Sequence, residues 1–156
     1  TDLIMIEHGN IQFTSTIPVG GIAITDAIAH GLDVPVKRAE EIKAEAGLSS
    51  TEAYPNLKTL LVPVMNSFVT EIKQVMAFHD QHSQEKIGKF VLVGGSAGLK
   101  SLPEFLQESL DPSRSLLVEL GDPTINVKVT LPSAISGTAV LPYTAALGLA
   151  MRGLSL

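Results

Sequence analysis

The stretch Lys89-Phe90-Val91-Leu92-Val93-Gly94-Gly95-Ser96-Ala97-Gly98-Leu99 decides the fold of this chain. Its apolar residues 90–93 predict a short buried strand, and the two glycines that follow end that strand in a tight loop. Residues 102–110 are helical in character, with Pro103 in the first turn. A strand, a glycine-rich loop and a helix in this order form a β-loop-α unit, which is typical of mixed α/β domains.

An antiparallel hairpin is predicted at the beginning of the chain. Residues 3–6 are an apolar run, which indicates a strand buried on both faces. His8-Gly9-Asn10 indicates a tight turn, and residues 11–19 then alternate between apolar and polar side chains. Two strands that follow each other across so short a turn are expected to pair with each other.

Three helices are predicted between the hairpin and the glycine-rich stretch. The first opens at Gly20-Gly21 and ends at Gly31, and the second covers residues 36–46. The third follows an i, i+3, i+4, i+7 apolar pattern over residues 57–80. Pro63 lies inside this pattern and predicts a kink or a new helix start.

The last third of the chain predicts two strands and a helix. Residues 116–118 indicate a strand, and residues 125–131 alternate as a weaker one. No charged residue occurs from 129 to 151, a length that could span a bilayer. Because Pro142 and a second proline interrupt this stretch, we expect a buried core helix at 139–152 and no membrane insertion.

Composition excludes several classes of function. Apolar residues make up 45% of the 156 residues and charged residues 17%, which predicts a folded domain. A net charge of −5 and an aromatic content of 4% argue against nucleic-acid binding, which needs basic grooves and stacking rings. Disulfides and thiolate chemistry are excluded because the chain has no cysteine. Since the chain opens directly on a strand, we expect it to be part of a longer protein.

The glycine-rich loop admits two interpretations after a third is excluded. Gly94 to Gly98 fit the G-x-S-x-G pattern of hydrolases, but every histidine precedes Ser96, against the order that such a triad requires. A glycine pair after a buried strand also lets a nucleotide approach the backbone closely. The other interpretation is a plain strand-to-helix turn, and the loop by itself leaves both open.

Two further polar features have ordinary explanations. His79 and His82 flank an aspartate, and two histidines beside a carboxylate can bind a metal. We favour the other interpretation, in which these residues are the frayed end of a helix with His79 on its apolar face. Lys43 shares an apolar stripe with Ala39 and Ile42. Its ammonium group is therefore expected either to reach solvent or to meet an anionic ligand.

Five motifs occur in one order along the chain, and together they resemble the second half of actin-like ATPases of the FtsA/PilM group. They are Ile17-Pro18-Val19-Gly20-Gly21, Thr25, Ala39-Glu40-Glu41-Ile42-Lys43, residues 91–99, and residues 145–153. Within that group, Gly121-Asp122-Pro123 and the ending of the chain are most similar to the PilM family of type IV pilus assembly proteins. The resemblance implies an α/β fold, namely a ribonuclease-H-like lobe of the actin-like ATPase kind. It implies that residues 1–156 are the second lobe, that about 32–80 form a small attached helical subdomain, and that the first lobe is absent.

The resemblance also implies ATP, with Mg, in a cleft between the two lobes. Thr1 then corresponds to the end of a phosphate loop, and Glu40 and Lys43 contact the ribose and base region. The implied adenosine motif consists of Gly94, Gly95, Ser96 and Leu99. Lys100 to Pro103 depart from the family pattern, which often has Pro-Gly after the leucine. No catalytic residue and no metal ligand is assigned in this chain.

By resemblance, the function is that of a nucleotide-dependent scaffold in type IV pilus assembly. The implied partner is an inner-membrane protein of the PilN type, docked through the first lobe, and self-association is a further expectation. The implied location is cytoplasmic and peripheral to the inner membrane. The alternatives are an FtsA-like cell-division homologue and a sugar-kinase-type enzyme of the same superfold. Weak ATPase activity is the expected activity of the complete protein if it is an enzyme.

Overall fold

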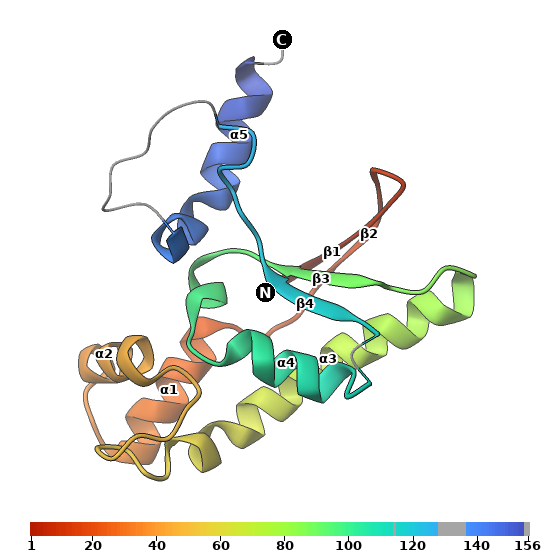
Figure 1. Cartoon of the computed structure of the whole chain (residues 1–156). Helices are drawn as coiled ribbons and strands as arrows, with labels where there is room; N and C mark the ends of the chain where they lie inside the picture. Colours follow the sequence, from red (N-terminus) through yellow and green to blue (C-terminus); the bar gives the residue numbers. More distant parts are fainter. Residues whose placement is uncertain (114, 128–136, 155–156) are drawn as a thin grey trace. The chain divides into compact units, whose positions relative to one another are not determined.

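The computed structural model describes residues 1–113, 115–127 and 137–154 and divides into two compact units (Figure 1). The N-terminal unit is Thr1–Ile87 and the C-terminal unit is Gly88–Leu156. The predicted helical subdomain at about 32–80 lies inside the N-terminal unit. Its elements are β1 (Asp2–Glu7), β2 (Asn10–Thr16), α1 (Gly21–Leu32), α2 (Val36–Ala46) and α3 (Leu57–His82). Those of the C-terminal unit are β3 (Lys89–Leu92), η1 (Gly95–Gly98), α4 (Leu102–Leu110), β4 (Leu117–Leu120), η3 (Gly137–Tyr143) and α5 (Thr144–Leu154).

The predicted hairpin is confirmed. Strand β1 pairs antiparallel with β2, from Asp2 opposite Thr16 to Glu7 opposite Asn10. The two turn residues His8 and Gly9 have φ angles of 50° and 79°. Positive φ at both positions defines a type I′ turn, whose twist matches the twist of the strands that it joins.

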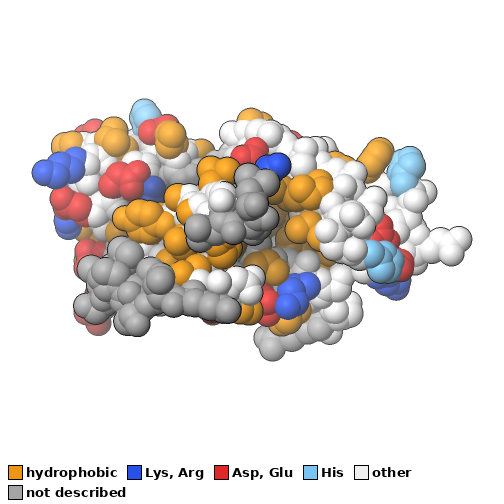
Figure 2. Space-filling view, turned by 90° about the horizontal axis from the view of Figure 1, so that it is seen from above, with side chains coloured by type: hydrophobic (Ala, Val, Ile, Leu, Met, Phe, Trp, Pro, Cys, Tyr) orange, Lys and Arg blue, Asp and Glu red, His pale blue; other side chains and the backbone are white. Residues whose placement is uncertain are grey.

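The prediction that residues 3–6 are buried on both faces is wrong. One face of the hairpin is half-buried, and on it Phe13 lies 6.0 Å from the ring of Phe78 of α3. The other face is exposed, and the side chain of Ile6 on it is 65% accessible. Hydrophobic side chains also reach the surface in the view of Figure 2. An apolar run therefore predicted the strand correctly, but it could not say what covers each face.

Helix α1 packs against both α2 and α3. Contrary to prediction, α1 does not end at Gly31 but continues to Leu32, and Asp33 adopts the left-handed cap conformation. Gly31 has a packing role instead, because a Cβ there would lie 1.9 Å from Cδ1 of Leu60 in α3. The glycine thus permits close approach of two helices.

Helix α3 does not restart at Pro63 but runs without a break from Leu57 to His82. A proline inside a helix removes one backbone hydrogen bond. The buried face of α3 extends well beyond it on both sides, and we attribute the continuity of the helix to the burial of that face. The buried residues are Leu57, Leu61, Met65, Val69 and Ile72.

In the C-terminal unit, β3 and β4 pair in parallel, from Lys89 opposite Leu117 to Leu92 opposite Leu120. Helix α4 connects them and packs on β4, with Leu102, Leu106 and Leu110 buried. This confirms the predicted β-loop-α unit. Both the glycine-rich loop after β3 and the segment after β4 consequently leave the sheet at the same edge, where the carboxyl ends of parallel strands meet.

Two predictions for the end of the chain need correction. Ile125 and Asn126 lie in a turn and Val127 has no regular structure, so these residues do not form a strand, and residues 128–131 of the predicted strand fall outside the described residues. The predicted helix at 139–152 divides into the 3₁₀ helix η3, which holds Pro142, and α5, which begins at Thr144. None of the described side chains of α5 is buried, so it is not a core helix. No helix among the described residues is long and apolar enough to cross a membrane.

Candidate nucleotide site

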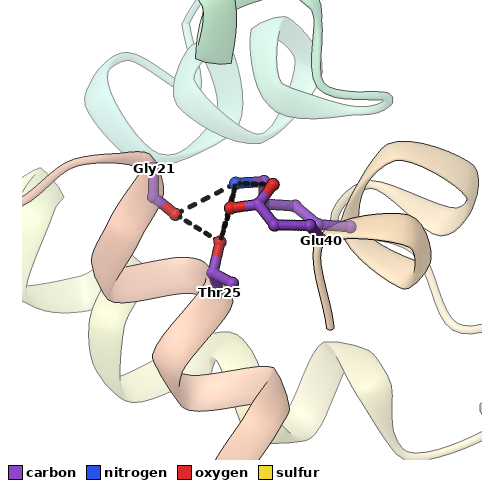
Figure 3. A network of polar contacts seen from close by, with 4 residues as sticks. Gly21, Thr25 and Glu40 are labelled. Atoms are coloured by element: carbon purple, nitrogen blue, oxygen red, sulfur yellow. Dashed lines mark hydrogen bonds and ion pairs between the residues drawn. The ribbon is translucent and has the colours of Figure 1, made fainter. Parts of the chain in front are cut away.

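Lys43 is the centre of a polar network between α1 and α2, drawn in Figure 3. Its Nζ lies 2.7 Å from Thr25 Oγ1, 3.2 Å from the carbonyl oxygen of Gly21 and 2.7 Å from Glu40 Oε2. A lysine ammonium has three N–H groups. Lys43 therefore has one acceptor residue for each donor, and its side chain is only 13% exposed. We expected the ammonium group of Lys43 to reach solvent or to meet a ligand. In the structure it instead binds acceptors within the protein.

Glu40 is the exposed member of this network. Thr25 Oγ1 donates to Glu40 Oε1 at 2.6 Å, and Lys43 holds both carboxylate oxygens. The hydrogen bond from Lys43, then that from Thr25, lowers the pKa of Glu40 below its usual range. The Glu40 side chain is nevertheless 51% exposed. Its carboxylate is thus ionised, fixed in direction and open to a hydrogen-bond donor from outside.

Thr1 lies close to the same helix start. Its Oγ1 donates to the carbonyl oxygen of Val19 at 2.7 Å, and the backbone groups of Thr1 pair with Ile17. Gly20 follows, and a Cβ on it would lie 3.5 Å from Thr1 Oγ1. The structure therefore brings the predicted residues of the N-terminal unit, Thr1, Glu40 and Lys43, to the residues that open α1.

The glycine-rich loop of the C-terminal unit offers open backbone. Gly94 has φ 92° and ψ 174°, a conformation that is available to glycine almost alone. Among the residues that the structure describes, a Cβ on Gly94 would meet nothing within 4 Å, and one on Gly95 would touch only Pro142 at 3.9 Å. The loop continues as one turn of 3₁₀ helix, Gly95–Gly98, rather than passing directly into α4. Gly95 and Ser96 are exposed at this turn.

Leu99 has a different position from the other predicted contacts. Its side chain is only 8% exposed. The backbone N–H of Leu99 donates to Ser96, which closes the 3₁₀ turn. Any contact of Leu99 with a ligand must therefore be made by its main chain, while its side chain anchors the loop to the core of the C-terminal unit.

A pocket of about 520 Å³ lies in the C-terminal unit, and its described lining residues come from 120–124, Val127 and η3 rather than from the glycine-rich loop. The helix η3 supplies one wall of the pocket, and the same helix holds the loop, because Gly94 N–H donates to the carbonyl oxygen of Leu141. Asp122 lines the pocket, and its hydrogen bonds from Thr124 keep the pKa of this carboxyl below its usual range. The volume is within the range of small-molecule sites. The sequence analysis did not predict this pocket, because the segment after β4 and the helix η3 both line it and no sequence pattern indicates that they meet.

Sequence reasoning also did not assign a role to Thr25 beyond its place in a motif. The Thr25 side chain is 2% exposed and is the buried polar residue of the described chain. A threonine in the middle of a predicted helix carries no signal of its own, and its partner Lys43 is 18 residues away. The predicted contacts Gly94 and Gly95 belong to the other unit, so their meeting with Lys43 across one pocket stays a prediction.

Three comparisons with known proteins bear on this geometry. The family described as cell division protein FtsA matches residues 1–148. A solved structure of a PilM–PilN type IV pilus biogenesis complex matches with a TM-score of 0.79 and 22% identity, over 97% of this chain and 42% of that one. The ethanolamine utilization protein EutJ from Carboxydothermus hydrogenoformans matches with a TM-score of 0.57 and 23% identity, over 76% of this chain and 40% of that one. No curated protein matches.

These findings define the class of protein. The chain has the α/β fold of an actin-like ATPase lobe, as the resemblance predicted. It belongs to the FtsA family, and its similarity to PilM confirms the predicted placement in the FtsA/PilM group. The chain spans less than half the length of the two solved relatives.

Proposed function

We propose that this chain is the adenosine-binding lobe of an actin-like scaffold protein that binds ATP with Mg between two lobes. The observation that supports the proposal most directly is the space that the described residues leave at Gly94-Gly95, where a Cβ would otherwise lie. The ionised carboxylate of Glu40 supplies an acceptor for the sugar. Gly94, Gly95 and Ser96 contact the adenosine through exposed groups, and Leu99 through its main chain. Thr1 ends the phosphate loop, whose other residues precede it, and the first lobe completes the cleft.

The cellular role that we propose is assembly of type IV pili. This role is supported by the similarity to a solved complex of PilM with PilN, which is a type IV pilus biogenesis complex. By analogy, the nucleotide clamps the two lobes, and a PilN-type inner-membrane protein docks on the first lobe in the clamped state. We propose on the same analogy that the protein is cytoplasmic and bound to the membrane through its partner, and that any ATPase activity of the complete protein is weak.

A nucleotide-binding measurement tests the site. In the protein that carries both lobes, Gly95→Val is expected to weaken ATP binding at least about 10-fold, because its side chain occupies the open space at the loop. Gly95 is not at positive φ, so the substitution does not strain the backbone. Gly88→Val is the matched control, since Gly88 precedes the same strand and also has open space around it. Unchanged ATP affinity in a folded Gly95→Val protein would contradict the nucleotide role of this loop.

A second candidate function is a role in cell division, favoured by the family description that matches residues 1–148. Both candidates use the same nucleotide site, so binding of ATP does not separate them. Deletion of the gene does: loss of surface pili with normal septation supports the pilus role, and filamentous cells support the division role. The pilus role would also be supported if the protein binds the cytoplasmic segment of a PilN-type protein directly and ATP strengthens that binding.

A further inference from the structure

We propose that Glu7, His8 and Glu85 of the N-terminal unit form a binding site for a divalent transition-metal ion, and that Zn²⁺ is the ion that fits it. Each of the three side chains offers one ligand atom, and these atoms lie within 4.8 Å of one another. The inference goes beyond the proposed function, because no nucleotide takes part in it. Neither the family resemblance nor the sequence pattern assigns a metal ligand to these residues.

The first step of the argument is the turn that brings two neighbouring residues to one point. Successive side chains of a strand point to opposite faces of the sheet. Glu7 is the last residue of β1, whereas His8 lies beyond the strand and has a φ of 50°. The backbone changes direction between them, so the carboxylate and the imidazole converge instead of pointing apart. Asn10 Nδ2 donates to the carbonyl oxygen of His8 at 3.3 Å, which supports the turn in this form.

The second step concerns Glu85, which lies in the connector between α3 and β3. Its backbone N–H donates to Ser83 Oγ at 3.1 Å, which restrains the connector at this point. Glu85 Oε1 lies 3.6 Å from Nε2 of His8. This distance is too long for a direct hydrogen bond. It is close to the separation of about 3.3–3.5 Å that two ligands of a tetrahedral zinc ion have at ordinary bond lengths.

The third step is the choice of ion, which follows from charge and ligand type. Two carboxylates so close to each other repel, and a divalent cation between them removes that repulsion. Mg²⁺ and Ca²⁺ favour oxygen ligands alone, whereas Zn²⁺ accepts an imidazole together with carboxylates. The side chains of His8 and Glu85 are 75% and 60% exposed, so water can occupy the remaining coordination position. A bound ion would connect the tip of the hairpin to the segment that follows α3.

The two histidines at the end of α3 differ from His8. Nδ1 of His79 is buried and lies 3.5 Å from Asp80, and Nδ1 of His82 lies 2.7 Å from the carbonyl oxygen of Phe78. Within the described part of the chain, neither histidine belongs to a group of three side chains that could hold a metal. His82 therefore provides a matched control for His8.

The test is calorimetric titration of Zn²⁺ into the metal-free protein that carries both lobes. We expect a Zn²⁺ site in the wild type that Glu85→Gln weakens at least about 10-fold, because a neutral amide replaces a charged ligand. Glu7→Gln should act in the same direction. His8→Asn should also weaken binding at least about 10-fold, and asparagine tolerates the positive φ of this turn, so the hairpin is preserved.

Two controls show whether the effect belongs to this site and this ion. His82→Asn should leave the Zn²⁺ affinity within about twofold of the wild type. Titration with Mg²⁺ should not distinguish Glu85→Gln from the wild type, since the site contains an imidazole. The inference is overturned if the wild type binds no Zn²⁺, or if Glu85→Gln and His8→Asn bind it as the wild type does. His8 and Glu85 would then be an exposed ion pair of small energetic weight.

Discussion

The candidate contacts of the N-terminal unit are side chains that hydrogen-bond to one another. Those of the C-terminal unit are backbone groups of glycines, with few described atoms close to them. Glu40 is held by Thr25 and Lys43, and Lys43 also donates to the carbonyl oxygen of Gly21. Gly94 and Gly95 have space where other residues carry a Cβ. The difference teaches that candidate contacts can depend on two kinds of order, a hydrogen-bond network in one unit and a backbone conformation in the other. Substitutions in the two units should therefore fail in different ways.

The largest effect is expected from a pair of glycines in helices, one in each unit. Gly31→Ala should lower the free energy of unfolding by roughly 1–3 kcal/mol, because its Cβ overlaps the side chain of Leu60, which must shift where α1 and α3 meet. Gly148→Ala in α5 has open space and should raise it by about 0.5–1 kcal/mol through helix propensity. Urea denaturation measures both. A gain in stability for Gly31→Ala as well would mean that α1 and α3 are not packed as closely as described.

A second pair tests the backbone of the glycine-rich loop. Gly94→Ala should destabilise the chain by roughly 1–2 kcal/mol, because φ 92° with ψ 174° strains a residue that has a Cβ. Gly95→Ala should be close to neutral, since Gly95 is not at positive φ. Thermal unfolding of the two variants side by side gives the result. Equal destabilisation would show that the two glycines are required for a reason other than conformation.

The sequence predicted what depends on local pattern and missed what depends on packing between elements. The turn at His8-Gly9 and the chain conformation at Gly94 after β3 follow from residue type, because few residues tolerate those conformations. The role of Gly31 depends on a leucine 29 positions later, and that of Thr25 on a lysine 18 positions later. No periodicity carries such information. For the same reason the pattern identified Lys43 as unusual but not the partners that explain it.

A third comparison sets two lysine–glutamate pairs against each other. Lys43 is mostly buried and has three acceptors, whereas Lys89 pairs with Glu119 at 2.8 Å with its side chain 52% exposed. Lys43→Met should cost about 1–2 kcal/mol, because it leaves partly buried acceptors without a donor. Lys89→Met should cost about 0.5 kcal/mol or less, the usual worth of an exposed pair. Chemical denaturation distinguishes these values, and equal costs would contradict a structural role for the network.

The smallest expected effect is the acid sensitivity that Glu40 confers on the N-terminal unit. Hydrogen bonds from Lys43 and Thr25 lower its pKa in the folded chain, so the folded state favours the ionised form. The resulting stabilisation is fully present above the pKa of about 4.5 that an unperturbed glutamate has, and it is lost as the pH falls through the lower pKa of the folded state. The difference in melting temperature between wild type and Glu40→Gln should therefore be constant from pH 7 to about pH 5 and shrink below that.

Asp111 provides the matched carboxylate of the C-terminal unit, because hydrogen bonds from Ser113, Leu116 and Ser115 also lower its pKa. Glu40→Gln should leave the acid sensitivity due to Asp111 in place, and Asp111→Asn should leave that due to Glu40. If Glu40→Gln shifts the melting temperature equally at every pH, the carboxylate is not held in its charged form by Thr25 and Lys43, and the contrast between the two units loses its basis.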